Sequence, residues 1–152
     1  MKILDKKINM LSENVYKMQA LKTYFKIKKI EPTEIEVKAG DEDITVRLFV
    51  IPISIFSTKA GISPIVNVVV TADSSKKVFG ELCTQDSFSS HKPTKIEDLK
   101  VINEGSTVVI VEDKEYTIKA EILNLSIYTD LRDVAGNPCV KVSSSVITYR
   151  LT

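Results

Sequence analysis

The sequence contains no tryptophan, a single histidine and only two cysteines in 152 residues. A single imidazole, with no second histidine and no nearby cysteine in the sequence, gives a histidine-based metal cage or a nucleophilic triad little to draw on. His91 is followed by Lys92 and Pro93 in a polar stretch, which is typical of a solvated loop. The five glycines form neither a GxGxxG nor a P-loop motif. We therefore expect a protein that is not an enzyme and that needs no metal and no cofactor.

Carboxylates occur in two clusters, but both clusters are short. One runs from Asp41 to Asp43, and the other from Glu112 to Glu115. A calcium loop spreads its ligands over a longer segment with a bidentate glutamate. We interpret both clusters as solvated turns.

An excess of charge of one sign is also missing, since 21 basic residues face 20 acidic ones for a net charge of +1. Proteins that bind duplex nucleic acid usually carry a clear basic excess. A single-strand binder of the oligonucleotide-binding barrel kind needs aromatic platforms in a basic groove. This chain has five tyrosines and five phenylalanines but no clear basic excess, so we expect no nucleic-acid partner.

Long apolar runs are absent as well. The longest, Leu48 to Phe56, is interrupted by Pro52 and Ser54 and is far shorter than the roughly 20 residues of a membrane helix. The charged start, Met1 to Lys7, lacks the apolar stretch of a signal peptide. The cysteines, Cys83 and Cys139, fit no CxxC or zinc spacing and stand among apolar or small residues. The sequence predicts buried free thiols in a cytoplasmic protein without a membrane segment.

Two periodicities organise the chain. Apolar residues first recur at spacings of four and three, which predicts an amphipathic helix over residues 4–20; they are Leu4, Ile8, Leu11, Val15 and Met18. The period then falls to two, which predicts four strands over residues 25–38, 44–56, 65–71 and 78–84. Pro32 interrupts the first strand and indicates a bulge or an edge. Short connections favour an antiparallel meander.

The segment from 107 to 135 fits two interpretations. Residues 108–111 and the alternating set Tyr116, Ile118, Ala120 and Ile122 resemble a hairpin. Five apolar residues from Ala120 to Val134 instead follow helical spacing, and Gly136 and Pro138 come after them as stop signals. We favour a helix over 119–135 after an extended 108–118, and a short helix begun by a Thr94–Glu97 capping box. The predicted class is α+β, a four-stranded antiparallel meander with an N-terminal amphipathic helix and a C-terminal helix packed on it, in one domain over residues 1–152.

This order of elements resembles the SecB-like chaperones. The resemblance is carried by the segments 25–30 and 35–39, the strand 44–50, Val70-Thr71-Ala72, Phe79-Gly80-Glu81-Leu82 with Phe88, Ile122-Leu123 with the helix to Val134, and Gly136-Asn137-Pro138. The chain departs from that family in having Leu125-Ser126-Ile127-Tyr128 where the family has Pro-Tyr-x-Arg, and in lacking a second C-terminal helix. A net charge near zero also disfavours coupling to an export motor and fits a toxin–antitoxin-associated relative better.

The resemblance implies a holdase that forms homotetramers and binds unfolded client polypeptides in an apolar groove between sheet and helix, with an antitoxin or export protein as a possible further partner. Apolar contact of this kind is non-directional and accepts many client sequences. The positions that match the groove are Val46, Leu48, Val50, Ile127 and Leu131. The alternative is an all-β binding or structural module, such as an accessory or virion protein, and it follows if residues 107–131 form a hairpin.

Overall fold

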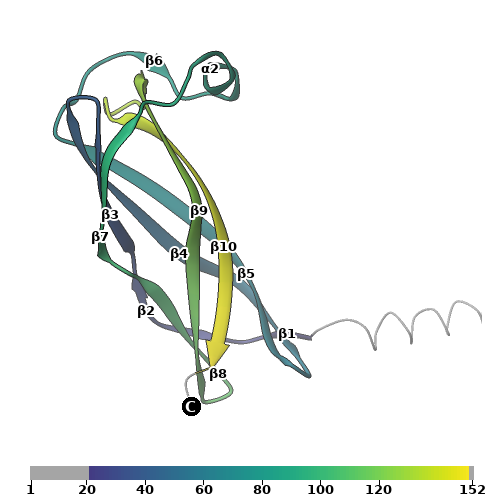
Figure 1. Cartoon of the computed structure of the whole chain (residues 1–152). Coiled ribbons are helices and arrows are strands. Elements are labelled where there is room, and N and C mark those ends of the chain that lie inside the picture. Colours follow the sequence, from purple (N-terminus) through teal and green to yellow (C-terminus); the bar gives the residue numbers. More distant parts are fainter. Residues whose placement is uncertain (1–20, 151–152) are drawn as a thin grey trace, which may run out of the picture.

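The computed structural model describes residues 21–150, and the strands of two sheets contain most of them (Figure 1). The strands are β1 (Leu21–Thr23), β2 (Lys26–Glu31), β3 (Thr33–Ala39), β4 (Glu42–Thr58), β5 (Gly61–Ser74), β6 (Glu81–Leu82), β7 (Ile96–Asn103), β8 (Ser106–Val111), β9 (Lys114–Arg132) and β10 (Pro138–Arg150). The helix among the described residues is the short α2 (Gln85–Ser90).

Sheet A is built around the long strand β4. One edge of β4 pairs with β3 over its first half and with β1 near its end, while β5 runs along the other edge. β7 pairs with β3 and forms the opposite border of this sheet. Sheet B has the order β10-β9-β8-β2, and β6 adds a two-residue parallel pairing to β9. The β5 and β10 edges lie side by side, so the two sheets come together along that border (Figure 1).

The core lies between the two sheets. Ile44 and Val46 of β4 pack with Val37 of β3 and with Ile127 of β9. Farther along β4, Val50 and Ile55 pack with the β8 and β9 side chains Val109, Val111, Ile118 and Ala120. Within sheet A the alternation of buried and exposed residues follows the period of two that the sequence shows. The strand prediction for residues 44–56 and 65–71 and the antiparallel pairing are thus confirmed.

The predicted α+β class is wrong, because the segment expected to form the C-terminal helix is strand β9. A tight turn at Glu112 and Asp113, both with positive φ of 50° and 64°, returns the chain from β8 into β9. In the helical stripe, Leu123 and Val134 are 68% and 89% exposed whereas Ile127 is fully buried. These side chains therefore do not share one face. The predicted four-stranded meander is replaced by two five-stranded sheets.

Two shorter predictions are corrected as well. Residues from Ile96 onward form strand β7 and not a helix begun by Thr94. The capping box lies earlier, where the Thr84 hydroxyl accepts from the Ser87 N–H and the Ser87 hydroxyl accepts from the Thr84 N–H, and it begins α2. Pro32 marks the point where the chain crosses from β2 in sheet B to β3 in sheet A. The predicted helix over residues 4–20 lies outside the described residues.

The prediction of free thiols is also wrong. Cys83, which precedes α2, forms a disulfide with Cys139 at the start of β10, with 5.8 Å between their Cα atoms. Phe88 of α2 packs edge-on against Tyr128 of β9 beside this bond, at 4.9 Å between ring centroids. The disulfide and this aromatic pair hold the β6–α2 segment against sheet B at one end of the molecule (Figure 1).

Candidate functional site: the outer face of sheet A

The five positions matched to a chaperone groove are buried in the structure. Val46 and Leu48 pack in the same core cluster as Ile127, from opposite sheets. Val50 and Leu131 belong to two other clusters. None of the five is more than 5% exposed. The structure brings three of them together as interior packing, and a client chain has no access to them in this arrangement.

Apolar side chains gather instead on the face of β4 and β5 that points away from sheet B. We call this set the outer apolar patch, and it consists of Phe49, Ile51 and Ile53 of β4 with Ile65 and Val69 of β5. Alternate residues of a strand point to opposite faces, so these residues occupy the phase of β4 and β5 that the core does not use. The patch therefore adds apolar surface that the interior does not need.

Strand register brings the patch residues together. Phe49 lies opposite Val69, whereas Ile51 lies opposite the exposed Asn67 and Ile65 lies opposite Ser54, so two polar residues lie among the apolar ones. A β-bulge between Pro52 and Ser54 inserts Ile53 as an extra residue, which leaves its side chain 57% exposed. Ile65 is 52% and Val69 38% exposed. Isolated exposed apolar residues are ordinary, but several of them gathered on one sheet face are typical of a surface that binds another molecule.

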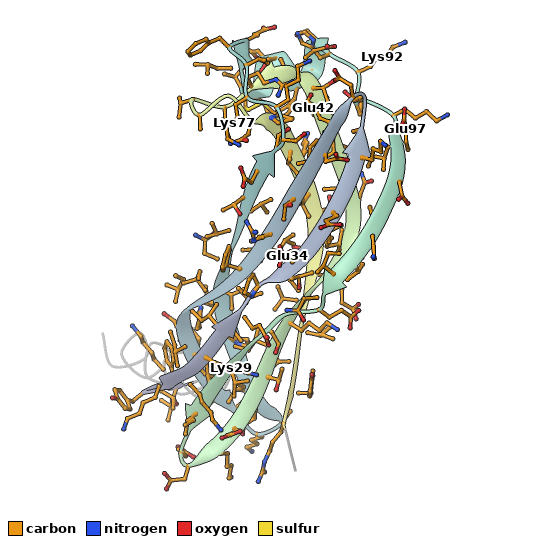
Figure 2. All side chains as sticks on the ribbon, turned by 90° about the vertical axis from the view of Figure 1, so that its left-hand side faces the viewer. Lys29, Glu34, Glu42, Lys77, Lys92 and Glu97 are labelled. Carbon is orange, nitrogen blue, oxygen red and sulfur yellow. A yellow bond between two sulfur atoms is a disulfide. The ribbon has the colours of Figure 1, made fainter. Side chains whose placement is uncertain are left out.

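The other half of the same outer face is charged. Arg47 donates to the Glu34 carboxylate at 3.1 Å across β4 and β3, and Glu36, Lys38 and Asp43 continue the charged surface. Figure 2 views this face and shows Glu34 near the middle of the sheet, with Glu42 toward the end that carries the disulfide. The outer face is thus divided into a charged half and an apolar half.

A signal for the patch was present in the sequence. Leu48 to Phe56 is apolar on nearly every residue, although a half-exposed strand normally alternates apolar with polar. Such a run indicates that both faces of the strand are apolar. The resemblance to the chaperones assigns binding to Val46, Leu48 and Val50, but these residues face the interior, and the alternate residues Phe49 and Ile51 face outward.

A buried ion pair joins the two sheets at the disulfide end. The Arg132 guanidinium of β9 donates to both carboxylate oxygens of Glu42 in β4, at 2.7 and 2.6 Å, and both side chains are almost fully buried. The Ser74 hydroxyl donates to the same carboxylate at 2.9 Å. Burial raises the pKa of Glu42, but the hydrogen bonds from Arg132 and Ser74 outweigh it and hold that pKa below its ordinary value. This ion pair links β4 of sheet A to β9 of sheet B in the interior.

The polar groups that could perform chemistry are dispersed. His91 bonds through Nε2 to the Glu81 carboxylate at 2.7 Å, near α2. Among residues 21–150 no group of three or more histidine, cysteine, aspartate or glutamate side chains is arranged to hold a metal. A cleft of about 410 Å³ at the opposite end of the molecule is lined by Lys59, Lys114, Tyr116 and Arg150 among others, and it opens to solvent.

Comparisons with known proteins give this chain no relatives: no family model, no curated protein and no solved structure matches it. Within the described part of the chain, no helix has the length and apolar character that crossing a membrane requires.

Proposed function

We propose that this chain is a non-catalytic, all-β binding module that holds another folded polypeptide against the outer apolar patch of sheet A. The observation that carries the proposal is the clustering of Phe49, Ile51, Ile53, Ile65 and Val69 on a face that the core leaves uncovered. This is the all-β alternative of the sequence analysis, and the β8–β9 hairpin supports it.

The patch is large enough to matter energetically. Complete burial of one valine, isoleucine or phenylalanine side chain stabilises by about 1.5–3 kcal/mol. Ile53, Ile65 and Val69 are each roughly half exposed. Covering these three would contribute about 2–4 kcal/mol before the entropic cost of association. A partner with a complementary apolar centre and a polar rim would add the remaining contacts.

The chaperone function stays a prediction, and so do its tetramer, its unfolded clients and its antitoxin or export partner. The outer apolar patch is a surface on which a holdase could bind unfolded chains, although the positions first matched to a groove are buried. The two functions differ in the occupant of the patch. A single folded partner would give a cross-linked product of one mass, whereas unfolded clients of many sequences would give products of many masses.

The cytoplasmic location also stays a prediction, and one observation weighs against it. Disulfides persist in oxidising compartments and are rare in the reducing cytosol. The Cys83–Cys139 bond therefore favours an oxidising setting. Alkylation of thiols in the intact source cells, followed by mass measurement of the chain, tests this: a doubly alkylated chain would support the cytoplasm, and an unalkylated chain an oxidising compartment.

The binding function is tested by placing a photo-cross-linking amino acid at Ile65, within the outer apolar patch, in cells that naturally make this chain. The matched control carries the same group at Thr71, which is exposed and lies on the same face of β5 outside the patch. We expect one discrete cross-linked product from position 65, none from position 71, and loss of the product when Ile53→Asp is added. A broad range of masses would overturn the proposal in favour of a holdase. Equal products from both positions, or none from either, would also overturn it.

A further inference from the structure

A second surface, separate from the outer apolar patch, is the free edge of sheet A at β7. Among the described strands, β7 pairs only with β3, so its other side is an edge with unpaired backbone groups. Figure 2 shows β7 at the border of the sheet, with Glu97 directed away from it. An edge strand of this kind is a template for pairing with another chain.

The side chains of β7 are more apolar than an edge exposed to water requires. Leu99 and Val101 lie opposite the buried residues Val37 and Ile35 of β3, on the side of the sheet that faces the core. Because β7 is the last strand, Leu99 is still 45% and Val101 50% exposed. A further strand beside β7 would cover both side chains.

The charges on the outer side of β7 specify which strand fits. Asp98 lies opposite Lys38, and Lys38 lies opposite Asp43, so charges alternate in sign across three strands. In the neighbouring row, Lys100 lies opposite Glu36. Within residues 21–150 none of these charged groups takes part in an ion pair within 4 Å.

We propose that β7 pairs antiparallel with β7 of a second copy of this chain, with Leu99 opposite Leu99 of that copy. A two-fold axis perpendicular to the sheet places one residue opposite itself. With Leu99 at that position, Asp98 lies opposite the second copy's Lys100, and Lys100 lies opposite its Asp98. The alternation of charge then continues without a break from Asp43 of one copy to Glu36 of the other.

The other registers are worse. An axis at Asp98 or at Lys100 places like charges directly opposite each other, which destabilises a strand pair. An axis at Val101 places Lys100 opposite the second copy's Ile102 and leaves the charges without partners. Register shifts next to Ile96 and Asn103 limit the regular part of β7 to residues 98–101, so the pairing is short and the dimer is expected to form only at raised protein concentration.

The experiment measures the mass of the full chain by light scattering over a series of concentrations. Wild type should move from the 17.0 kDa of one chain toward twice that value. Asp98→Lys and Lys100→Asp should each weaken the dimer at least tenfold, because each places like charges across the axis. An equimolar mixture of these two variants should recover it, since every cross-axis pair is then attractive.

Asp43→Lys is the matched control. It places a lysine opposite Lys38, as Asp98→Lys does, but on β4 and away from the edge, so the dimer should persist. A wild type that stays at the mass of one chain at every concentration would overturn the proposal. So would a mixture that fails to recover the dimer, or a dimer lost on Ile65→Asp, because the second copy would then occupy the outer apolar patch.

Discussion

Removing either partner of the Glu42–Arg132 ion pair should destabilise the fold strongly, and removing both should not. The two side chains are 2% and 5% exposed and are joined by two hydrogen bonds. Deleting one partner of a buried pair leaves an uncompensated charge and costs about 3–5 kcal/mol. Native domains are stable by only about 5–15 kcal/mol, so Glu42→Leu or Arg132→Met should remove a large fraction of the total.

The double variant Glu42→Leu with Arg132→Met should recover most of that loss. The Gly136 C=O still accepts from the Val78 N–H and the Ser74 hydroxyl still accepts from the Lys76 N–H, whereas the buried Ser74 O–H loses its acceptor. Arg132 Nε has no partner among the described residues, so its removal relieves an unsatisfied donor. We expect the double variant within about 2 kcal/mol of wild type, because an apolar pair of similar volume often replaces a buried ion pair at little cost.

The assay is urea unfolding at neutral pH, followed by far-ultraviolet circular dichroism because the chain has no tryptophan to report by fluorescence. The four proteins form a double-mutant cycle, and the coupling energy should reach at least about 4 kcal/mol, because two single losses of about 3 kcal/mol each exceed a double loss of about 2 kcal/mol by that amount. Additivity of the two single effects within about 0.5 kcal/mol would refute the reasoning, because the two groups would then not act as a pair.

Three further outcomes are expected. Replacing Cys83 and Cys139 by alanine removes the disulfide between residues 56 apart in the chain and should lower the free energy of unfolding by about 4 kcal/mol. A loss below about 1 kcal/mol in urea unfolding would show that the disulfide does not restrain the unfolded chain. The pKa of Glu42 is lowered in the folded state, so this group contributes stability that is present above its ordinary pKa of 4.5 and is lost as the pH falls through the folded pKa. The urea midpoint of wild type should therefore decline below about pH 4.5. It should decline less steeply in the double variant, which lacks the ion pair. Gly105→Ala places a methyl group on the backbone carbonyls of Glu31 and Pro32 and should cost at least about 3 kcal/mol; a thermal midpoint equal to that of wild type would contradict this.

Strands β3, β4 and β5 of sheet A could be predicted because the alternation along β3 and β4 is regular and because Gly40 and Gly61 provide the positive φ of the turns around β4. The β8–β9 hairpin was harder to predict. Its two-residue turn is Glu112-Asp113, which lacks the Asn-Gly or Asp-Gly sequence that usually indicates such a turn. Without that signal, the accidental helical spacing from Ala120 to Val134 outweighed the alternation from Tyr116 to Ile122.

The outer apolar patch could be predicted only in part. The sequence places apolar residues on both phases of β4, but only the packing of sheet B decides which phase becomes the interior. The disulfide has no local signal, because Cys83 and Cys139 meet only when α2 packs against sheet B. The same holds for Glu42 and Arg132, which are 90 residues apart in the chain.

The pairing of β8 with β9 is the claim on which this account depends most, because it places Leu48 inside and Ile65 outside. Nuclear Overhauser contacts measured on the full chain test it directly. We expect contacts between the backbone protons of Val108 and Thr117 and between those of Val140 and Ile127, as the strand register requires. Contacts between residues three and four apart along 119–135, such as Leu123 with Ile127, would show a helix there and would contradict the account.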